Sequence, residues 1–261
     1  MAFLENQITF ALLGGILPTL IWLWFWLRED IHPEPKRLIV KGFFAGVIAI
    51  PFALLFEAVI FCGSSLLLLE GTAPAWCSLA TPLLGTHPQL FEWVIIIGFA
   101  FAEEYVKYKV AYKFLLRGGD FDEPVDAMIY LMTVALGFAA FENFFFLISA
   151  FGRDMFEGLI VGNLRFLGAT LLHSISSGII GYSIALAFYK PERRRLYITV
   201  GILGATILHA AFNFLVTAIE KSEDGTGFTK ALLLLVITGV FIISAFDKVK
   251  KIKQQSKFIN S

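Results

Sequence analysis

The sequence predicts an all-α, polytopic membrane protein, a bundle of about seven transmembrane helices around a central polar pocket. Of its 261 residues, 57% are hydrophobic and 16% are charged, whereas an average soluble domain is about half apolar and a quarter charged. The apolar residues form long uninterrupted segments, as a membrane-spanning chain requires. Four of these segments carry ionisable residues near their centres. Such residues usually face the interior of a bundle, which predicts the pocket.

Seven apolar segments reach the ~20 residues that a transmembrane helix needs. They are Ile8–Leu27, Leu38–Leu69, Phe91–Leu116, Val125–Ala150, Leu159–Tyr189, Leu196–Ile219 and Phe228–Phe246. The second and fifth exceed the thickness of a bilayer, so we expect them to tilt or to project from it. Pro51 is expected to kink the second segment without ending it. Since the connections are short, we expect one transmembrane domain over residues 1–261.

The basic residues indicate an orientation. Lys and Arg gather in the connections at 28–41, 113–117 and 190–195 and in the tail at 247–261, and are scarce in the alternate connections. By the positive-inside rule, the N-terminus lies outside and the basic tail is cytoplasmic. The 21 basic residues equal the 21 acidic ones, so no nucleic-acid partner is predicted. Cys62 and Cys77 are too few for a disulfide framework, and pairing or two unpaired side chains both stay open.

The third segment carries Glu103, Glu104 and Lys107 at its centre. Each charge there costs at least ~2.5 kcal/mol on the insertion scale, which favours a role in the bundle interior. Glu103 and Lys107 are four residues apart and share a helix face, so we expect Lys107 to neutralise Glu103. Glu104 points about 100° away, toward a different neighbour.

The next three segments each carry one ionisable residue with a polar companion on the same or the next turn. These pairs are Glu142 with Asn143, His173 with Ser177, and His209 with Asn213. At 1.5 Å per residue, the ionisable groups of all four segments fall within roughly 6 Å of one plane. A single buried histidine is often only a hydrogen-bonding residue. Four helices with such residues at one depth favour a shared site instead.

This set of side chains suits hydrolysis of a peptide bond in or near the bilayer. One route uses His173, His209 and Glu142 as ligands of Zn²⁺, with Glu103 or Glu104 as the base. The other uses no metal: a glutamate activates water, and histidine stabilises the oxyanion. The residues leave both routes open.

Four motifs, in order, resemble those of the PrsW family of bacterial intramembrane proteases, which is related to the CAAX-processing and bacteriocin-processing membrane proteases. They are Glu103-Glu104-Tyr105-Val106-Lys107, Phe138 to Glu142-Asn143, His173 with Ser177, and His209 with Asn213. The resemblance implies a catalytic core at 91–219, with Glu103, Glu104, Glu142, His173 and His209 as catalytic residues. Lys107, Asn143, Ser177 and Asn213 would support them.

The resemblance also implies a multi-pass protein of a bacterial inner membrane that cuts a membrane-protein substrate near its extracytoplasmic side. The best-known substrate of the family is a single-pass anti-sigma factor, cut at site 1. Two alternatives stay open. A proton-coupled transporter or channel would use the same residues, usually with repeated halves, which the sequence lacks. A non-catalytic binding or immunity protein of the same fold would have lost a motif residue.

Overall fold

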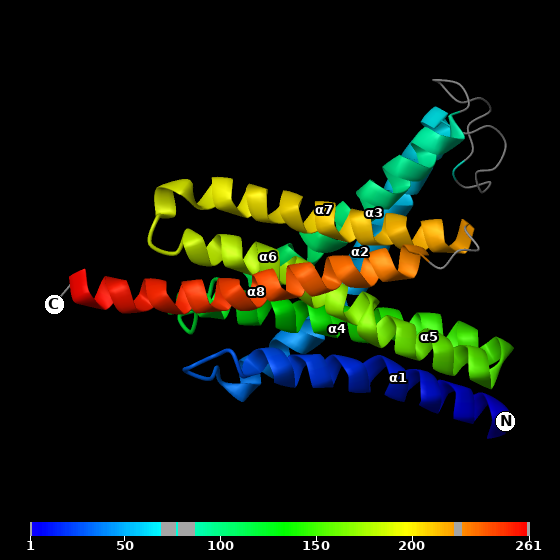
Figure 1. Cartoon of the computed structure of the whole chain (residues 1–261), viewed down its shortest axis with the longest axis horizontal. Helices are drawn as coiled ribbons and strands as arrows, with labels where there is room; N and C mark the ends of the chain where they lie inside the picture. Colours follow the sequence, from blue (N-terminus) through cyan, green and yellow to red (C-terminus); the bar gives the residue numbers. More distant parts are fainter. Residues whose placement is uncertain (1, 69–76, 78–86, 222–225, 260–261) are drawn as a thin grey trace.

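The computed structural model describes residues 2–68, 77, 87–221 and 226–259, and its regular elements in this part are all helical (Figure 1). They are α1 (Ala2–Leu27), α2 (Lys36–Leu68), α3 (Pro88–Phe114), α4 (Pro124–Arg153), α5 (Met155–Leu167), α6 (Ala169–Leu186), the 3-10 helix η1 (Pro191–Arg193), α7 (Arg194–Lys221) and α8 (Thr226–Ile259). The predicted all-α membrane bundle is confirmed.

Within the described residues, six helical units are long and apolar enough to cross a membrane. α5 and α6 together form one of these units. They correspond to the expected fifth segment, which a break at Gly168 divides into two helices. The expected third segment is the helix α3, which does not meet the same measure of length and composition, and its central cluster of charges accounts for this. It nevertheless packs against α2 and α7. The helix with the least membrane-like composition therefore carries the polar motif.

α4 is the central helix and contacts α1, α2, α3, α5, α6 and α8. Nearly every side chain in its first half is buried, and helices that are apolar on all sides belong in such places. Gly46 of α2 and Gly137 of α4 let the two backbones touch. A Cβ atom at Gly46 would collide with the Val134 carbonyl, and one at Gly137 with the Phe43 carbonyl. Small residues at such crossings fix the distance between membrane helices.

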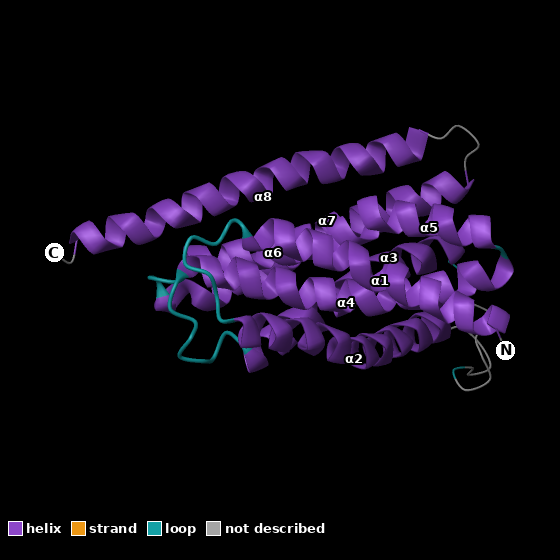
Figure 2. Cartoon of the chain, turned by 90° about the horizontal axis from the view of Figure 1, so that it is seen from below, coloured by secondary structure: helices purple, strands orange, loops and turns teal. Residues whose placement is uncertain are grey.

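α2 and α3 form a hairpin that runs obliquely to the other helices, and Figure 2 shows α8 on the face opposite α2. Pro51 lies inside α2, which continues through it as expected. Cys62 and Cys77 form a disulfide, which answers the question that the sequence left open. α8 continues as a helix to Ile259, through most of the basic tail expected at 247–261.

The bundle has two distinguishable ends (Figure 1). The disulfide end holds the N-terminus of α1, the Cys62–Cys77 bond and the turn from α4 to α5. The basic end holds the connections from α1 to α2, from α3 to α4 and from α6 to α7, together with the C-terminus of α8. The Lys- and Arg-rich connections all lie at the basic end.

Candidate active site

The fold brings the five expected catalytic residues together from four helices. Glu103 and Glu104 come from α3, Glu142 from α4, His173 from α6 and His209 from α7. All but Glu142 are buried, and Glu142 is half-buried. Hydrogen bonds and ion pairs connect the five side chains into one cluster.

Glu104 is fully buried and its carboxylate is saturated with partners. Its Oε1 accepts a hydrogen bond from Lys107 Nζ at 2.6 Å and lies 2.9 Å from His209 Nδ1. Ser176 Oγ donates to Oε1 at 2.9 Å, and Ser177 Oγ donates to Oε2 at 3.1 Å. Ser177, the polar companion of His173 on the next turn, thus has its hydroxyl on Glu104. Glu104 is held rigidly and in turn holds His209.

Lys107 is also fully buried, and its main partner differs from the one expected. Its Nζ lies 3.8 Å from Glu103 Oε2 but 2.6 Å from Glu104 Oε1, so Glu104 is the stronger partner. Residues three and four apart on a helix are both neighbours, and here the i,i+3 pair is closer. Lys107 Nζ also lies 3.0 Å from His173 Nδ1 and 4.8 Å from the centre of the Phe138 ring.

The contacts of His173 identify which of its nitrogens carries the proton. An ammonium group has no acceptor, so His173 Nδ1 must accept from Lys107, and its Nε2–H is left to donate. Nε2 lies 2.8 Å from Glu142 Oε2, which accepts its hydrogen bond. The same oxygen accepts from Arg165 Nη2 at 2.7 Å. Glu142 thus orients the far side of the His173 ring.

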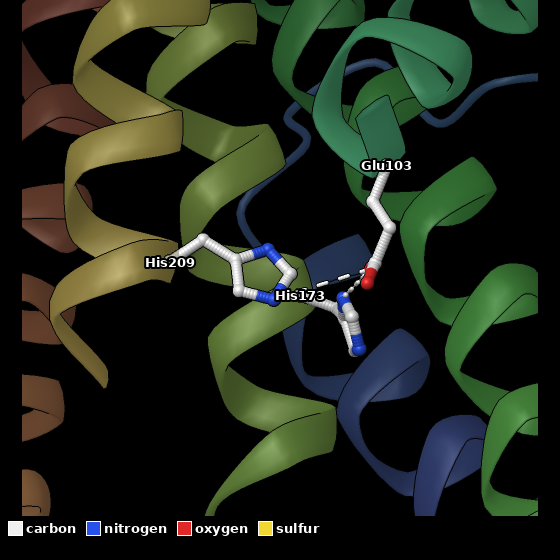
Figure 3. A group of neighbouring side chains, drawn as sticks. All are labelled: Glu103, His173 and His209. Atoms are coloured by element: carbon white, nitrogen blue, oxygen red, sulfur yellow. Dashed lines mark ion pairs between the residues drawn. The ribbon is translucent and has the colours of Figure 1, made fainter. Parts of the chain in front are cut away.

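Glu103 differs from the other glutamates because its buried oxygen is unpaired. Among the described side chains, none makes a hydrogen bond to Glu103 Oε2. This atom lies 3.7 Å from His173 Nδ1 and 4.0 Å from His209 Nε2, and Figure 3 shows both rings turned toward it. In the described part of the chain, these three residues form the one group with the spacing of metal ligands. The sequence interpretation placed Glu142 in this group, whereas Glu142 lies on the opposite nitrogen of His173.

A cavity of about 870 Å³ adjoins this group and extends toward the disulfide end. Glu103, Glu142, His173, His209 and Asn213 all line it, whereas Glu104 and Lys107 lie behind its wall. Its remaining lining is mostly apolar and comes from α2, α3, α4, α5, α6, α7 and α8. The site therefore has room for a polypeptide segment beside Glu103 Oε2, the buried carboxylate oxygen of the cluster that makes no hydrogen bond.

Two members of the cluster, Arg165 and Thr170, were not predicted from the sequence. Arg165 of α5 donates from Nε to Asn143 Oδ1 at 2.6 Å, in addition to its bond to Glu142. Asn143 Nδ2 in turn donates to Thr170 Oγ1 at 2.8 Å. A signal did exist: Glu142 has no basic residue within its own turn, and Arg165 lies in the next apolar segment. An intramembrane carboxylate predicts such a partner.

Comparisons with known proteins give matches over most of the chain. The family model described as PrsW family intramembrane metalloprotease matches residues 34–245. Curated relatives named Protease PrsW include one from Geobacillus kaustophilus, 26% identical over 241 residues that cover 92% of this chain and 91% of the relative. Another, from Clostridioides difficile, is 27% identical over 250 residues, covering 93% and 91%. No solved structure gives a significant match.

Proposed function

Because the chain belongs to the PrsW family of intramembrane metalloproteases, we propose that it hydrolyses a peptide bond of a membrane-protein substrate and that Glu103, His173 and His209 form its active site. The observation that carries this proposal is the buried, unpaired oxygen of Glu103, which faces both histidines at the wall of the cavity. A buried carboxylate oxygen without a partner is costly. It is expected where a ligand or a reacting proton completes its contacts.

The residues fit a zinc ion. Glu103 Oε2, His173 Nδ1 and His209 Nε2 would hold it, and their spacings of 3.7 and 4.0 Å are near the ~3.4 Å between two ligands of one tetrahedral zinc. Each histidine has its other nitrogen on a carboxylate: Glu142 for His173 and Glu104 for His209. Such carboxylate–histidine pairs fix the rings of metal-binding histidines. When bound, zinc would polarise the scissile carbonyl and lower the pKa of water.

The protein groups have separate tasks in this mechanism. Glu104 accepts a hydrogen bond from Nδ1–H of His209, so that Nε2 faces the cavity without a proton. Glu142 accepts from Nε2–H of His173. His173 Nδ1 therefore carries no proton, and it faces Lys107 at 3.0 Å and Glu103 at 3.7 Å. Lys107 offsets the charge of Glu104 at 2.6 Å. The two serine hydroxyls prevent Glu104 from turning toward the cavity.

One observation favours a metal-free variant of the same reaction. Lys107 Nζ lies 3.0 Å from His173 Nδ1 and therefore occupies the nitrogen that a metal would need. In that variant Glu103 takes a proton from water, and His209, with a proton on both nitrogens, stabilises the oxyanion through Nε2–H while Nδ1–H stays on Glu104. Metal analysis of the purified protein separates the two. Stoichiometric zinc that is lost in His173→Ala/His209→Ala supports the metal route, and full proteolysis without metal supports the other.

The cavity suits a substrate that arrives from the bilayer. Leu54 of α2, Phe146 of α4 and Leu164 of α5 line the cavity, and each is also exposed at the apolar outer surface of the bundle. α2 and α5 both pack on α4, and residues of all three helices line the cavity. These apolar side chains offer a transmembrane segment a route from lipid into the cavity. A single-pass protein such as an anti-sigma factor has the required form.

The disulfide supports cleavage near the extracytoplasmic side. Disulfides persist in oxidising compartments, so the Cys62–Cys77 bond supports an orientation with this end outside the cytoplasm. The basic connections then lie in the cytoplasm, as the positive-inside rule requires. In this orientation the N-terminus is outside, the C-terminus is cytoplasmic, and the cavity extends outward from the middle of the membrane.

The decisive test compares the parent protein with Glu103→Gln in proteoliposomes that contain tagged single-pass membrane proteins, with anti-sigma factors tried first. We expect the variant to lose at least about 100-fold in cleavage rate, a common loss for a group that acts on the reacting atoms. Glu157→Gln, on the outer surface of α5, is the matched control and should cleave normally. Equal cleavage by the parent and Glu103→Gln would refute the proposed role.

A further inference from the structure

We propose that Arg165 is a positioning residue, which acts on the reaction through Glu142 and His173. The inference rests on the proposed function and adds a residue to it. Arg165 lies on α5, three residues before Gly168, where the chain breaks to begin α6. Its side chain is 15% exposed at the edge of the cavity. An arginine is rare within a membrane segment, and one that faces the interior usually has a function there.

The guanidinium of Arg165 binds two successive residues of α4 at once. Nη2 donates to Glu142 Oε2 at 2.7 Å, and Nε donates to Asn143 Oδ1 at 2.6 Å. Its carbon Cζ lies 3.9 Å from the centre of the Phe146 ring, one turn further along α4. A planar fork can satisfy both acceptors in one orientation, whereas a lysine can reach them only as a point charge. The contact therefore depends on arginine itself and not only on its charge.

Glu142 needs such a partner because it is the most open member of the cluster. Its side chain is 25% exposed and lines the cavity, whereas Glu104 is fully buried among four donors. The oxygen that binds His173 Nε2 at 2.8 Å is the one that Arg165 binds. Arg165 thus keeps this oxygen directed at the histidine. Without it, the carboxylate can turn into the cavity, and the His173 ring loses its fixed orientation.

The charges of the site support the same assignment. Three carboxylates, Glu103, Glu104 and Glu142, face two permanent cations, Lys107 and Arg165, within the described cluster. Lys107 lies closest to Glu104, and Arg165 binds Glu142. Glu103 alone among them keeps a fully buried oxygen without a hydrogen bond. By holding Glu142 Oε2, Arg165 keeps that carboxylate on His173 and away from the position that Glu103 occupies.

A purely structural role is the alternative, since Arg165 also ties α5 to α4. The chain offers a matched control for it. Arg153, the last residue of α4, forms an ion pair with Glu157 of α5 at 2.5 Å, far more exposed and outside the cavity. Arg153→Met and Arg165→Met each remove one arginine link between the same two helices. Only Arg165→Met releases Glu142.

The experiment measures kcat, KM and thermal unfolding of the purified, full-length variants, with the tagged single-pass membrane protein that the parent cleaves in proteoliposomes as substrate. For Arg165→Met we expect kcat to fall about 10- to 100-fold, as for loss of a group that orients a metal-binding histidine, with KM within about twofold. Arg165→Lys should recover part of the loss, and Arg153→Met should stay within about twofold of the parent. Equal losses in the two methionine variants, or an unchanged kcat in Arg165→Met, would overturn the proposal. If Arg165→Met does not fold, an unchanged kcat in Arg165→Lys overturns it.

A double-mutant cycle tests whether Arg165 acts through Glu142. If it does, Glu142→Gln and Glu142→Gln/Arg165→Met should lose similar activity, because the second change removes nothing further. Multiplied losses would contradict the inference. Zinc affinity, measured by competition with a chelator, gives a readout that needs no cleavage, and Arg165→Met should weaken it about 10- to 100-fold. If the parent cleaves nothing and Arg165→Met still binds zinc more weakly than the parent does, the result supports the role of Arg165 and refutes the protease proposal. Normal Arg165→Met kinetics beside an inactive Glu103→Gln would refute only the role of Arg165.

Discussion

The two adjacent glutamates of α3 should lose very different amounts of stability on the same isosteric change. Glu104→Gln removes the carboxylate that lies 2.6 Å from the fully buried Lys107 Nζ. Loss of one member of a buried ion pair costs about 3–5 kcal/mol, because the other charge stays buried without its partner. Glu103 Oε2, 3.8 Å from the same ammonium, offsets part of this, so we expect the lower end of the range. Glu103→Gln removes no hydrogen bond from Oε2 and should cost less than about 1 kcal/mol.

Thermal unfolding in detergent, followed by circular dichroism, measures this difference. For a chain of this size, about 3 kcal/mol lowers the midpoint by on the order of 10 °C. We therefore expect Glu104→Gln to melt about 10 °C below the parent and Glu103→Gln within about 3 °C of it, although both lose proteolysis. The double variant Glu104→Gln/Lys107→Met should recover stability, because it removes the unpaired charge. A Glu104→Gln midpoint equal to that of the parent, or an equal decrease for Glu103→Gln, would refute this division of roles.

Three further predictions concern regions outside the site. Gly46→Ala pushes a methyl group into the backbone of α4 and should cost about 1–3 kcal/mol in unfolding, whereas Gly63→Ala on the same helix meets open space and should not destabilise it. Burial raises the pKa of Asp30, so its contribution to stability is complete below its ordinary pKa and is lost as pH rises through the raised value. The melting midpoint of Asp30→Asn should therefore rise relative to that of the parent between pH 4 and 8, and a constant difference would contradict this. An impermeant maleimide added to intact cells should label Cys62 and Cys77 only after reduction, and labelling confined to inverted vesicles would overturn the proposed orientation.

The fold was predictable wherever apolar length alone decides it. Six of the expected segments have the length and composition of membrane spans, and Pro51 stays inside α2 as predicted. The break at Gly168 was not predicted, because the residues on both sides continue the same apolar pattern. The helical continuation of α8 into the tail was also missed. Lys and Gln favour helices nearly as well as apolar residues do, so the change of charge after Asp247 does not mark a helix end.

The site was predictable as a set of residues but not as a set of contacts. The motifs identify which glutamates and histidines meet, since four helices carry them at one depth. They do not identify which atoms face one another. Lys107 can reach residue 103 or 104, because helix neighbours lie three and four apart. Likewise, either Glu103 or Glu142 could have faced both histidines, and small helix rotations decide between them. Arg165 could not be predicted from the motifs because it belongs to none of the four, and only the charge of Glu142 points to it.

The geometry explains why two glutamates stand side by side in α3. Successive residues on a helix point about 100° apart, so one carboxylate can face α6 and α7 while the other faces the cavity. Glu104 takes the inner direction and binds His209, Ser176 and Ser177. Glu103 takes the outer direction and keeps an oxygen without a hydrogen bond beside both histidines. Lys107, on the next turn, lies near both and compensates the charge of the one that is enclosed. Both oxygens of Glu104 are taken by the groups that enclose it, so the oxygen without a hydrogen bond has to come from a second carboxylate that points in another direction.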